Sequence, residues 1–217
     1  MKNVRVRFEK KGAARYISHL DLTRCMSRAL KLSGLPVWYT EGFNPRIYMT
    51  YAMPLSLGVQ GDRECMDIRL LEDRDFPEIV SALNERLPVD IRILSAAEPV
   101  RKFEEIAYAE YEVFLETEHA ERLETALRNL LSREEILVMK HGKKGDKEID
   151  IKPYFADSDI HRTESGCLSV SFRLPCSVSG SVNPALLLDA LQRLEGEEPD
   201  ARIVRKRLLT EDFSEIK

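Results

Sequence analysis

Cysteine and histidine are scarce in this chain of 217 residues, with four residues of each type. No two cysteines stand at Cys-x-x-Cys spacing and the histidines are equally dispersed, so no local ligand set for zinc or an iron–sulfur cluster is present. We therefore expect no metal and no disulfide framework. No run approaches the roughly 18 apolar residues of a membrane-spanning helix, and the N-terminal residues lack the apolar region of a signal peptide. These absences predict a cytoplasmic protein without membrane contact.

Familiar catalytic and nucleotide-binding motifs are also missing. The sequence has no Gly-x-Gly-x-x-Gly, no Gly-Lys-Ser/Thr phosphate loop, no Gly-x-Ser-x-Gly elbow and no His-Glu-x-x-His. We expect no cofactor, and the first hypothesis is a protein without catalytic activity.

What the chain does have is a composition of 43% apolar and 32% charged residues, which is typical of a globular protein with one large or two small domains. Its charge is unevenly distributed. The net charge is −4, but residues 1–58 carry ten Lys/Arg against three Asp/Glu, a net of +7, and the remainder carries −11. Such asymmetry is typical of a surface that faces an anion. A basic edge that acidic neighbours compensate in the fold would give the same numbers.

The apolar periodicity predicts an α+β fold. Alternating apolar residues indicate strands at 4–8, 65–71 and 89–94, and helical spacing indicates helices at 18–33 and from 75 to before Pro88. With a short strand at 37–40, the order is strand, helix, strand, strand, helix, strand, and it recurs after residue 107. We expect two tandem ferredoxin-like (βαββαβ) units, a basic one over residues 1–98 and an acidic one over 107–217.

Exposed strand positions bear on how such a protein would contact RNA. The RNA recognition motif needs aromatic residues on its third strand, but the positions expected to be exposed there are Cys65, Asp67 and Arg69. Any nucleic-acid contact must come from elsewhere. On the last strand, Arg205 and Arg207 are expected to share one exposed face.

The first predicted helix carries a basic stripe. Arg24, Arg28 and Lys31 fall at i, i+4 and i+7, so they lie on one helix face, and Asp21 neutralises little of their charge. The stripe predicts phosphate contacts, while an ordinary solvated helix face is the alternative.

A Gly- and Pro-punctuated segment over residues 41–51 combines an arginine with three aromatic residues. An arginine side chain can form two parallel hydrogen bonds to a phosphate, and aromatic faces stack on bases. In the alternative, the aromatic residues cap the core and Arg46 is solvated. The candidate nucleic-acid-binding set is Arg15, Arg24, Arg28, Lys31, Phe43, Asn44, Arg46 and Tyr48.

His19 follows Ser18 at the start of the predicted helix, where the helix dipole lowers a histidine pKa. With Tyr16 nearby, the residues also fit a metal-free RNA-cleaving site. A histidine that helps to cap the helix is the alternative.

Five blocks in order carry a family resemblance, over residues 15–24, 28–30, 34–36, 42–46 and 54–58. They resemble the bacterial radical SAM-linked domain of unknown function, which occurs free-standing or fused behind a B12-binding radical SAM protein. The resemblance is dense over residues 4–70 and continues to about residue 195. The chain lacks the Cys-x-x-x-Cys-x-x-Cys motif of radical SAM enzymes. The resemblance therefore implies a non-catalytic accessory protein, RNA-binding or substrate-presenting, for a separate radical SAM enzyme that modifies tRNA, rRNA or the ribosome.

Two other interpretations remain open. The segment Phe43-Asn44-Pro45, followed by Pro54-Leu55, is similar to the CRISPR repeat-processing endoribonucleases, which pair two ferredoxin-like units and often use an early histidine. This resemblance implies a metal-independent endoribonuclease with His19 and Tyr16 as candidate catalytic residues, although the chain lacks that family's glycine-rich loop after Gly196. The third interpretation is a pure protein-docking module whose basic face is incidental.

Overall fold

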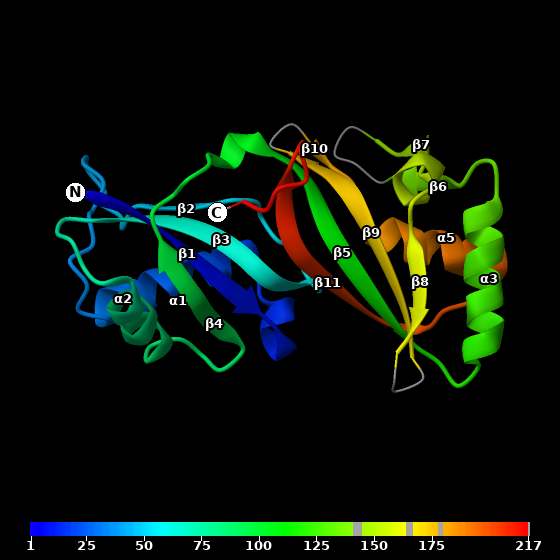
Figure 1. The fold of residues 1–217 in the computed structure, drawn as a ribbon, viewed down its shortest axis with the longest axis horizontal. Helices are drawn as coiled ribbons and strands as arrows, with labels where there is room; N and C mark the ends of the chain where they lie inside the picture. The colour runs from blue at the N-terminus through cyan, green and yellow to red at the C-terminus, as the bar shows by residue number, and fades with distance from the viewer. Residues whose placement is uncertain (141–144, 164–166, 178–179, 217) are drawn as a thin grey trace. The chain divides into compact units, whose positions relative to one another are not determined.

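The computed structural model describes residues 1–140, 145–163, 167–177 and 180–216. The fold is α+β, and its strands pair mostly antiparallel (Figure 1). Two compact units are present: unit 1 combines Met1–Ala107 with Arg205–Lys217, and unit 2 is Tyr108–Val204. No helix in the described ranges is long and apolar enough to cross a membrane.

Unit 1 contains a sheet in the order β4-β1-β3-β2, in which every neighbouring pair is antiparallel. Its elements are β1 (Lys2–Lys10), η1 (Gly12–Tyr16), α1 (His19–Leu32), β2 (Met49–Tyr51), β3 (Gln60–Leu70), α2 (Phe76–Asn84), β4 (Ile91–Ala97) and η2 (Phe103–Glu105).

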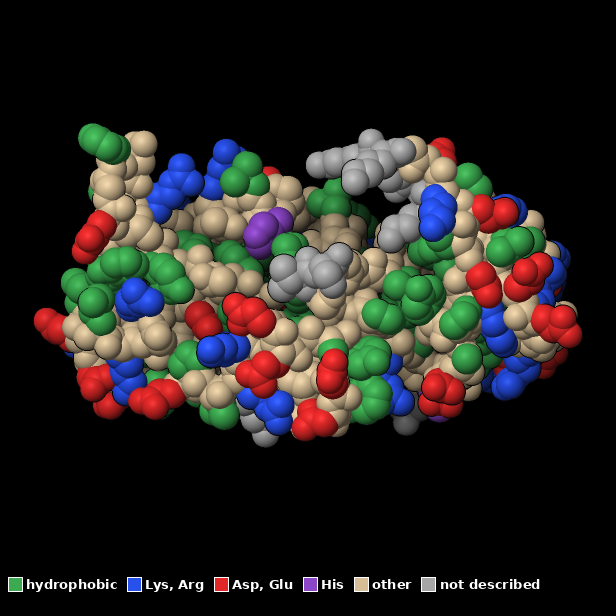
Figure 2. Space-filling view, turned by 90° about the horizontal axis from the view of Figure 1, so that it is seen from above, with side chains coloured by type: hydrophobic (Ala, Val, Ile, Leu, Met, Phe, Trp, Pro, Cys, Tyr) green, Lys and Arg blue, Asp and Glu red, His purple; other side chains and the backbone are tan. Residues whose placement is uncertain are grey.

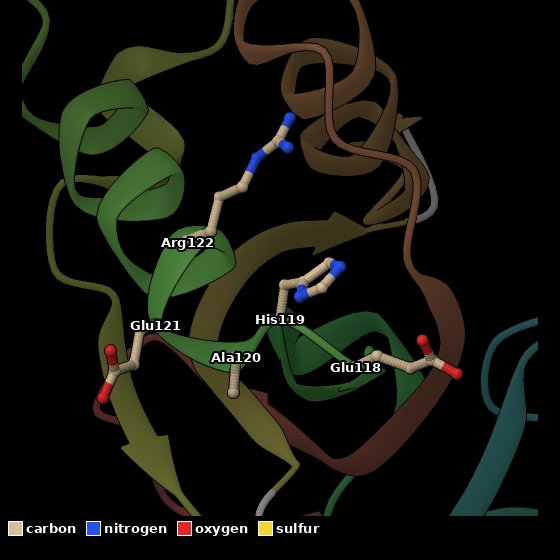
Figure 3. Close-up of a pocket in the computed structure, with 5 residues that line it drawn as sticks. All are labelled: Glu118, His119, Ala120, Glu121 and Arg122. Atoms are coloured by element: carbon tan, nitrogen blue, oxygen red, sulfur yellow. The ribbon is translucent and has the colours of Figure 1, made fainter.

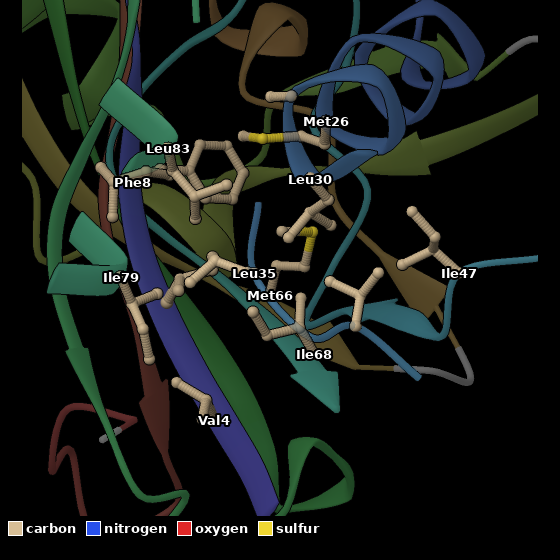
Figure 4. Close-up of a cluster of buried hydrophobic side chains, with 14 of the residues drawn as sticks. Val4, Phe8, Met26, Leu30, Leu35, Ile47, Met66, Ile68, Ile79 and Leu83 are labelled. Carbon is tan, nitrogen blue, oxygen red and sulfur yellow. The ribbon is translucent and has the colours of Figure 1, made fainter. Parts of the chain in front are cut away.

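The core of unit 1 lies between one face of this sheet and the two helices. Because side chains alternate along a strand, β1 turns Val4, Val6 and Phe8 to the same face, where each is at most 1% exposed. Met26 of α1 and Ile79 of α2 pack into the same cluster (Figure 4). Helical spacing places one apolar stripe of each helix on the sheet, which leaves the opposite stripe of α1 to solvent.

Unit 2 has β9 between β5 and β8, with β10 also paired to β9, and a separate two-stranded sheet of β6 and β7. Its elements are β5 (Ile106–Glu116), which begins at the end of unit 1, α3 (Ala120–Ser132), β6 (Leu137–Lys140), β7 (Lys147–Asp150), α4 (Lys152–Phe155), β8 (Asp159–Arg162), β9 (Leu168–Ser177), β10 (Gly180–Ser181), α5 (Ala185–Glu195) and β11 (Asp200–Thr210), which runs into unit 1.

The C-terminal segment completes unit 1. Ile216 is 1% exposed, and its backbone N–H donates to the carbonyl of Leu208 at 3.1 Å. The Arg7 side chain donates to the Ile216 carbonyl at 2.8 Å. Residues from the first strand and from the end of the chain therefore belong to one packed body.

The α+β class expected from the sequence is confirmed. The tandem ferredoxin-like arrangement stays a prediction, as do the domain boundaries at residues 98 and 107. Two observations bear on them: residues 205–217 pack with unit 1 rather than with the second half of the chain, and β6 pairs with β7 in a sheet of its own.

Candidate nucleic-acid interface

Helix α1 begins where the sequence places its cap. The Ser18 hydroxyl accepts the backbone N–H of Asp21 at 3.1 Å and donates to the Asp21 carboxylate at 2.7 Å. Hydrogen bonds from Ser18 and then Arg24 hold the pKa of the Asp21 carboxyl below its usual value. The helix buries Leu22, Met26, Ala29 and Leu30, so Arg24, Arg28 and Lys31 are exposed on its outer face.

Most of the positive charge in residues 1–58 is compensated within unit 1. Of the ten basic side chains, Lys10 is 1% exposed beside Glu64. Five others form ion pairs: Lys2 with Asp73 and Glu98, Arg5 with Asp67, Arg7 with Glu215, Lys11 with Glu9 and Asp62, and Arg24 with Asp21. On the face in Figure 2, basic and acidic side chains likewise lie next to one another over much of the surface.

Four basic side chains remain without a carboxylate partner among the described residues: Arg15, Arg28, Lys31 and Arg46. All four belong to the set expected to bind nucleic acid. Arg15 lies over the ring of Tyr16, with its guanidinium carbon 4.6 Å from the ring centroid. Arg24, the fifth basic member of the set, is paired, so it contributes less free charge than the helix pattern suggests.

The segment over residues 37–48 folds back on itself as a hairpin. Tyr39 bridges to Ile47, and the backbone N–H of Thr40 donates to the carbonyl of Arg46 at 2.8 Å. Ile47 is buried in the core, which anchors the hairpin. At the tip, Phe43 is fully exposed, and Asn44 and Arg46 are also exposed. Phe43 therefore caps no core, contrary to the alternative interpretation of the aromatic residues, whereas Tyr51 packs against the core as that alternative expected.

Tyr48 is placed differently from Phe43. It is partly exposed at the base of the hairpin, where it contacts Trp38 and Arg69. Nothing in the spacing of residues 38, 48 and 69 indicates that they meet, so the sequence alone does not predict Trp38 as a partner of Tyr48. An isolated tryptophan beside a tyrosine-containing loop was the available signal.

His19 and Tyr16 are not brought together by any contact between described residues. The Tyr16 hydroxyl accepts a hydrogen bond from Arg15, while the His19 ring packs edge-on against Tyr51 with centroids 4.8 Å apart. Burial, and to a smaller extent the charge of Lys10, lowers the pKa of His19. A neutral imidazole against an aromatic ring fits a packing role.

Arg205 corrects one expectation from the sequence. Only Arg207 is exposed; Arg205 is 2% exposed and bound to Glu64 and to the carbonyls of Met53 and Pro54. The expected exposed face is therefore wrong for Arg205, whose side chain is held by the loop at 53–54 and by Glu64.

The other candidate sites give little support for a function. The described residues contain no cluster of three or more His, Cys, Asp or Glu side chains that could hold a metal ion. A depression of about 580 Å³ lies at the start of α3, lined by residues 118–122, where Glu118 and Glu121 point to opposite sides of His119 (Figure 3). It includes none of the residues singled out from the sequence.

A family model described as "Uncharacterized protein conserved in bacteria (DUF2344)" matches residues 3–184. The chain belongs to this bacterial family of unknown function. None of the curated proteins is similar enough to match it. The "Crystal Structure of an Unknown Protein from Galdieria sulphuraria" is 16% identical, over 93% of this chain and 96% of that chain, with a TM-score of 0.27. A likeness of this degree supports no statement about fold or function.

Proposed function

We propose that this protein binds RNA through unit 1 and, as a non-catalytic accessory, presents it to a separate radical SAM enzyme that modifies tRNA, rRNA or the ribosome. The observation that carries the RNA-binding part is the selective compensation of charge. Six of the ten basic side chains in residues 1–58 have an acidic neighbour, whereas Arg15, Arg28, Lys31 and Arg46 have none among the described residues. Uncompensated cations on a surface are what phosphate groups bind.

The hairpin adds a second type of contact. A fully exposed phenylalanine at its tip keeps an apolar ring in water, which is unfavourable, and contributes nothing to the core. Beside Asn44 and Arg46, it offers a flat apolar face with polar flanks, which suits a base. Phe43→Ser is therefore expected to weaken RNA binding and to leave the free energy of unfolding within about 0.5 kcal/mol of the parent value.

The partner follows from the family resemblance together with what the chain lacks. Without the Cys-x-x-x-Cys-x-x-Cys motif it supplies no radical chemistry itself, and an accessory role remains. In the same proposal, unit 1 keeps the ferredoxin-like plan, which its antiparallel strand order β4-β1-β3-β2 supports.

The test is RNA affinity as a function of salt. Four phosphate contacts on single-stranded RNA give a slope of log K against log salt of about −2.8, so affinity falls about fifty-fold between about 50 and about 200 mM. Arg28→Ala with Lys31→Ala reduces the slope by about 1.4. Both side chains are exposed and alanine favours helix, so the fold is retained.

A matched control removes two positive charges elsewhere. Arg92 and Arg193 are exposed outside the interface, and Arg92→Ala with Arg193→Ala is expected to leave the slope unchanged. Salt-insensitive or absent RNA binding overturns the RNA-binding proposal. Nuclease-resistant co-purification with a partner enzyme would then identify a protein-docking module instead.

A further inference from the structure

We infer that Trp38, Arg69 and Tyr48 form a platform on which an unpaired base of the RNA stacks. This inference rests on the proposed function and deepens it, because it specifies single-stranded rather than duplex RNA.

The platform is built by three chain segments that lie side by side. The backbone N–H of Trp38 donates to the Arg69 carbonyl at 2.8 Å, and that of Tyr48 donates to the Trp38 carbonyl at 3.0 Å. The Arg69 guanidinium carbon lies 4.8 Å from the Trp38 ring centroid and 4.5 Å from that of Tyr48. The two rings are 5.7 Å apart. One planar cation therefore contacts both aromatic rings.

These three side chains face away from the core. Their chain neighbours Val37, Ile47 and Ile68 are at most 7% exposed and belong to the cluster under α1 and α2. Because side chains alternate across an extended segment, Trp38, Tyr48 and Arg69 lie on the opposite face, and each is partly exposed.

The charge of the platform also suits RNA. Arg69 has no carboxylate partner among the described residues; its Nε donates to the Asn3 side chain at 3.0 Å. This bond orients the guanidinium plane without neutralising it. Aromatic and guanidinium planes are the groups on which splayed bases stack, and the residual positive charge attracts the adjoining phosphate. Bases within a duplex are already stacked and cannot reach such a surface.

Trp38 makes this inference directly measurable, because it is the sole tryptophan of the chain. We would titrate the protein with a single-stranded RNA of about eight nucleotides, its duplex, and an abasic strand with the same phosphates. The expected result is quenching of Trp38 fluorescence by the single strand alone. Affinity for the single strand should exceed that for the abasic strand by about tenfold.

Variants separate stacking from packing. Tyr48→Phe keeps the ring and is expected to retain single-strand affinity. Tyr48→Leu removes the ring and Arg69→Lys removes the planar cation but keeps the charge; each should lose about tenfold in single-strand affinity with duplex affinity unchanged. Should Tyr48→Leu unfold the hairpin, Arg69→Lys alone decides.

The outcomes distinguish the two proposals. Equal, salt-dependent binding of single-stranded, abasic and duplex RNA without a fluorescence change overturns the platform and leaves RNA binding intact. Absence of binding to all three RNAs overturns the proposed function and the platform together.

Discussion

The carboxylate of Glu64 on β3 and the guanidinium of Arg205 on β11 meet at two points inside unit 1. Nε of Arg205 lies 2.9 Å from Oε1 of Glu64 and its terminal nitrogen 2.5 Å from Oε2, and both side chains are at most 5% exposed. Arg205 also donates to the carbonyls of Met53 and Pro54. One buried ion pair thus connects β11, the sheet of unit 1 and the loop after β2.

Glu64→Gln is expected to destabilise the protein by about 3–5 kcal/mol, because it leaves the Arg205 charge buried without its counter-charge. Lys10, which is also buried beside Glu64, loses the same neighbour. Urea unfolding measures the change. Arg63→Ala is the control, since Arg63 is an exposed member of an ion pair with Glu215 and should cost no more than about 1 kcal/mol. A comparable small loss in Glu64→Gln would show that the buried pair is not stabilising.

The stability of unit 1 should depend on pH through His19. Burial and the nearby Lys10 lower the pKa of His19 in the folded protein, so the unfolded chain binds a proton at higher pH. The contribution of His19 to the free energy of unfolding is therefore fully present above the unfolded pKa of about 6.5. It is lost progressively as the pH falls below that value.

The measurement compares the unfolding free energies of the parent and His19→Gln at about pH 8 and about pH 5.5, on either side of the unfolded pKa. The variant should lose less stability on acidification. His161→Gln, at an exposed position in unit 2, serves as the matched control. Identical pH dependence in the parent and His19→Gln would refute this role of His19.

RNA incubated with the protein and without divalent metal is expected to remain intact. The Tyr16 hydroxyl is engaged by Arg15, and His19 packs on Tyr51 rather than contacting Tyr16. Gel analysis and end-group assays of the products check this expectation. Products ending in 2′,3′-cyclic phosphate that disappear in His19→Ala would establish the endoribonuclease interpretation in its place.

Local signals in the sequence were sufficient for α1 and β1 of unit 1, but the strand expected at 37–40 was wrong: that segment has only isolated bridges, and the second strand is β2 at Met49–Tyr51. Ser18 and the spacing of Leu22, Met26 and Leu30 predicted a helix that the structure has at His19–Leu32, because capping and amphipathic spacing act within a few residues. The alternation of Val4, Val6 and Phe8 likewise predicted β1.

The sequence alone could not predict which distant acidic residues neutralise the basic side chains of residues 1–58. Asp67 pairs with Arg5 from 62 positions away, and Glu215 pairs with Arg7 from the far end of the chain. Neither pairing has a local signature, so the net charge of residues 1–58 overstated the free positive charge. For the same reason the contact of Trp38 with Arg69 became visible only in the folded chain.

The packing of the C-terminal segment into unit 1 also constrains synthesis. Arg7 and Ile216, which are joined by a hydrogen bond, stand 209 positions apart, and the whole of unit 2 is translated between them. Since domains fold as they emerge from the ribosome and contacts between distant positions form slowly, unit 2 can fold while unit 1 still waits for its last strand. Until then β3 lacks its pairing with β11, and a chain truncated before Arg205 would leave that edge of β3 unpaired and become prone to aggregation.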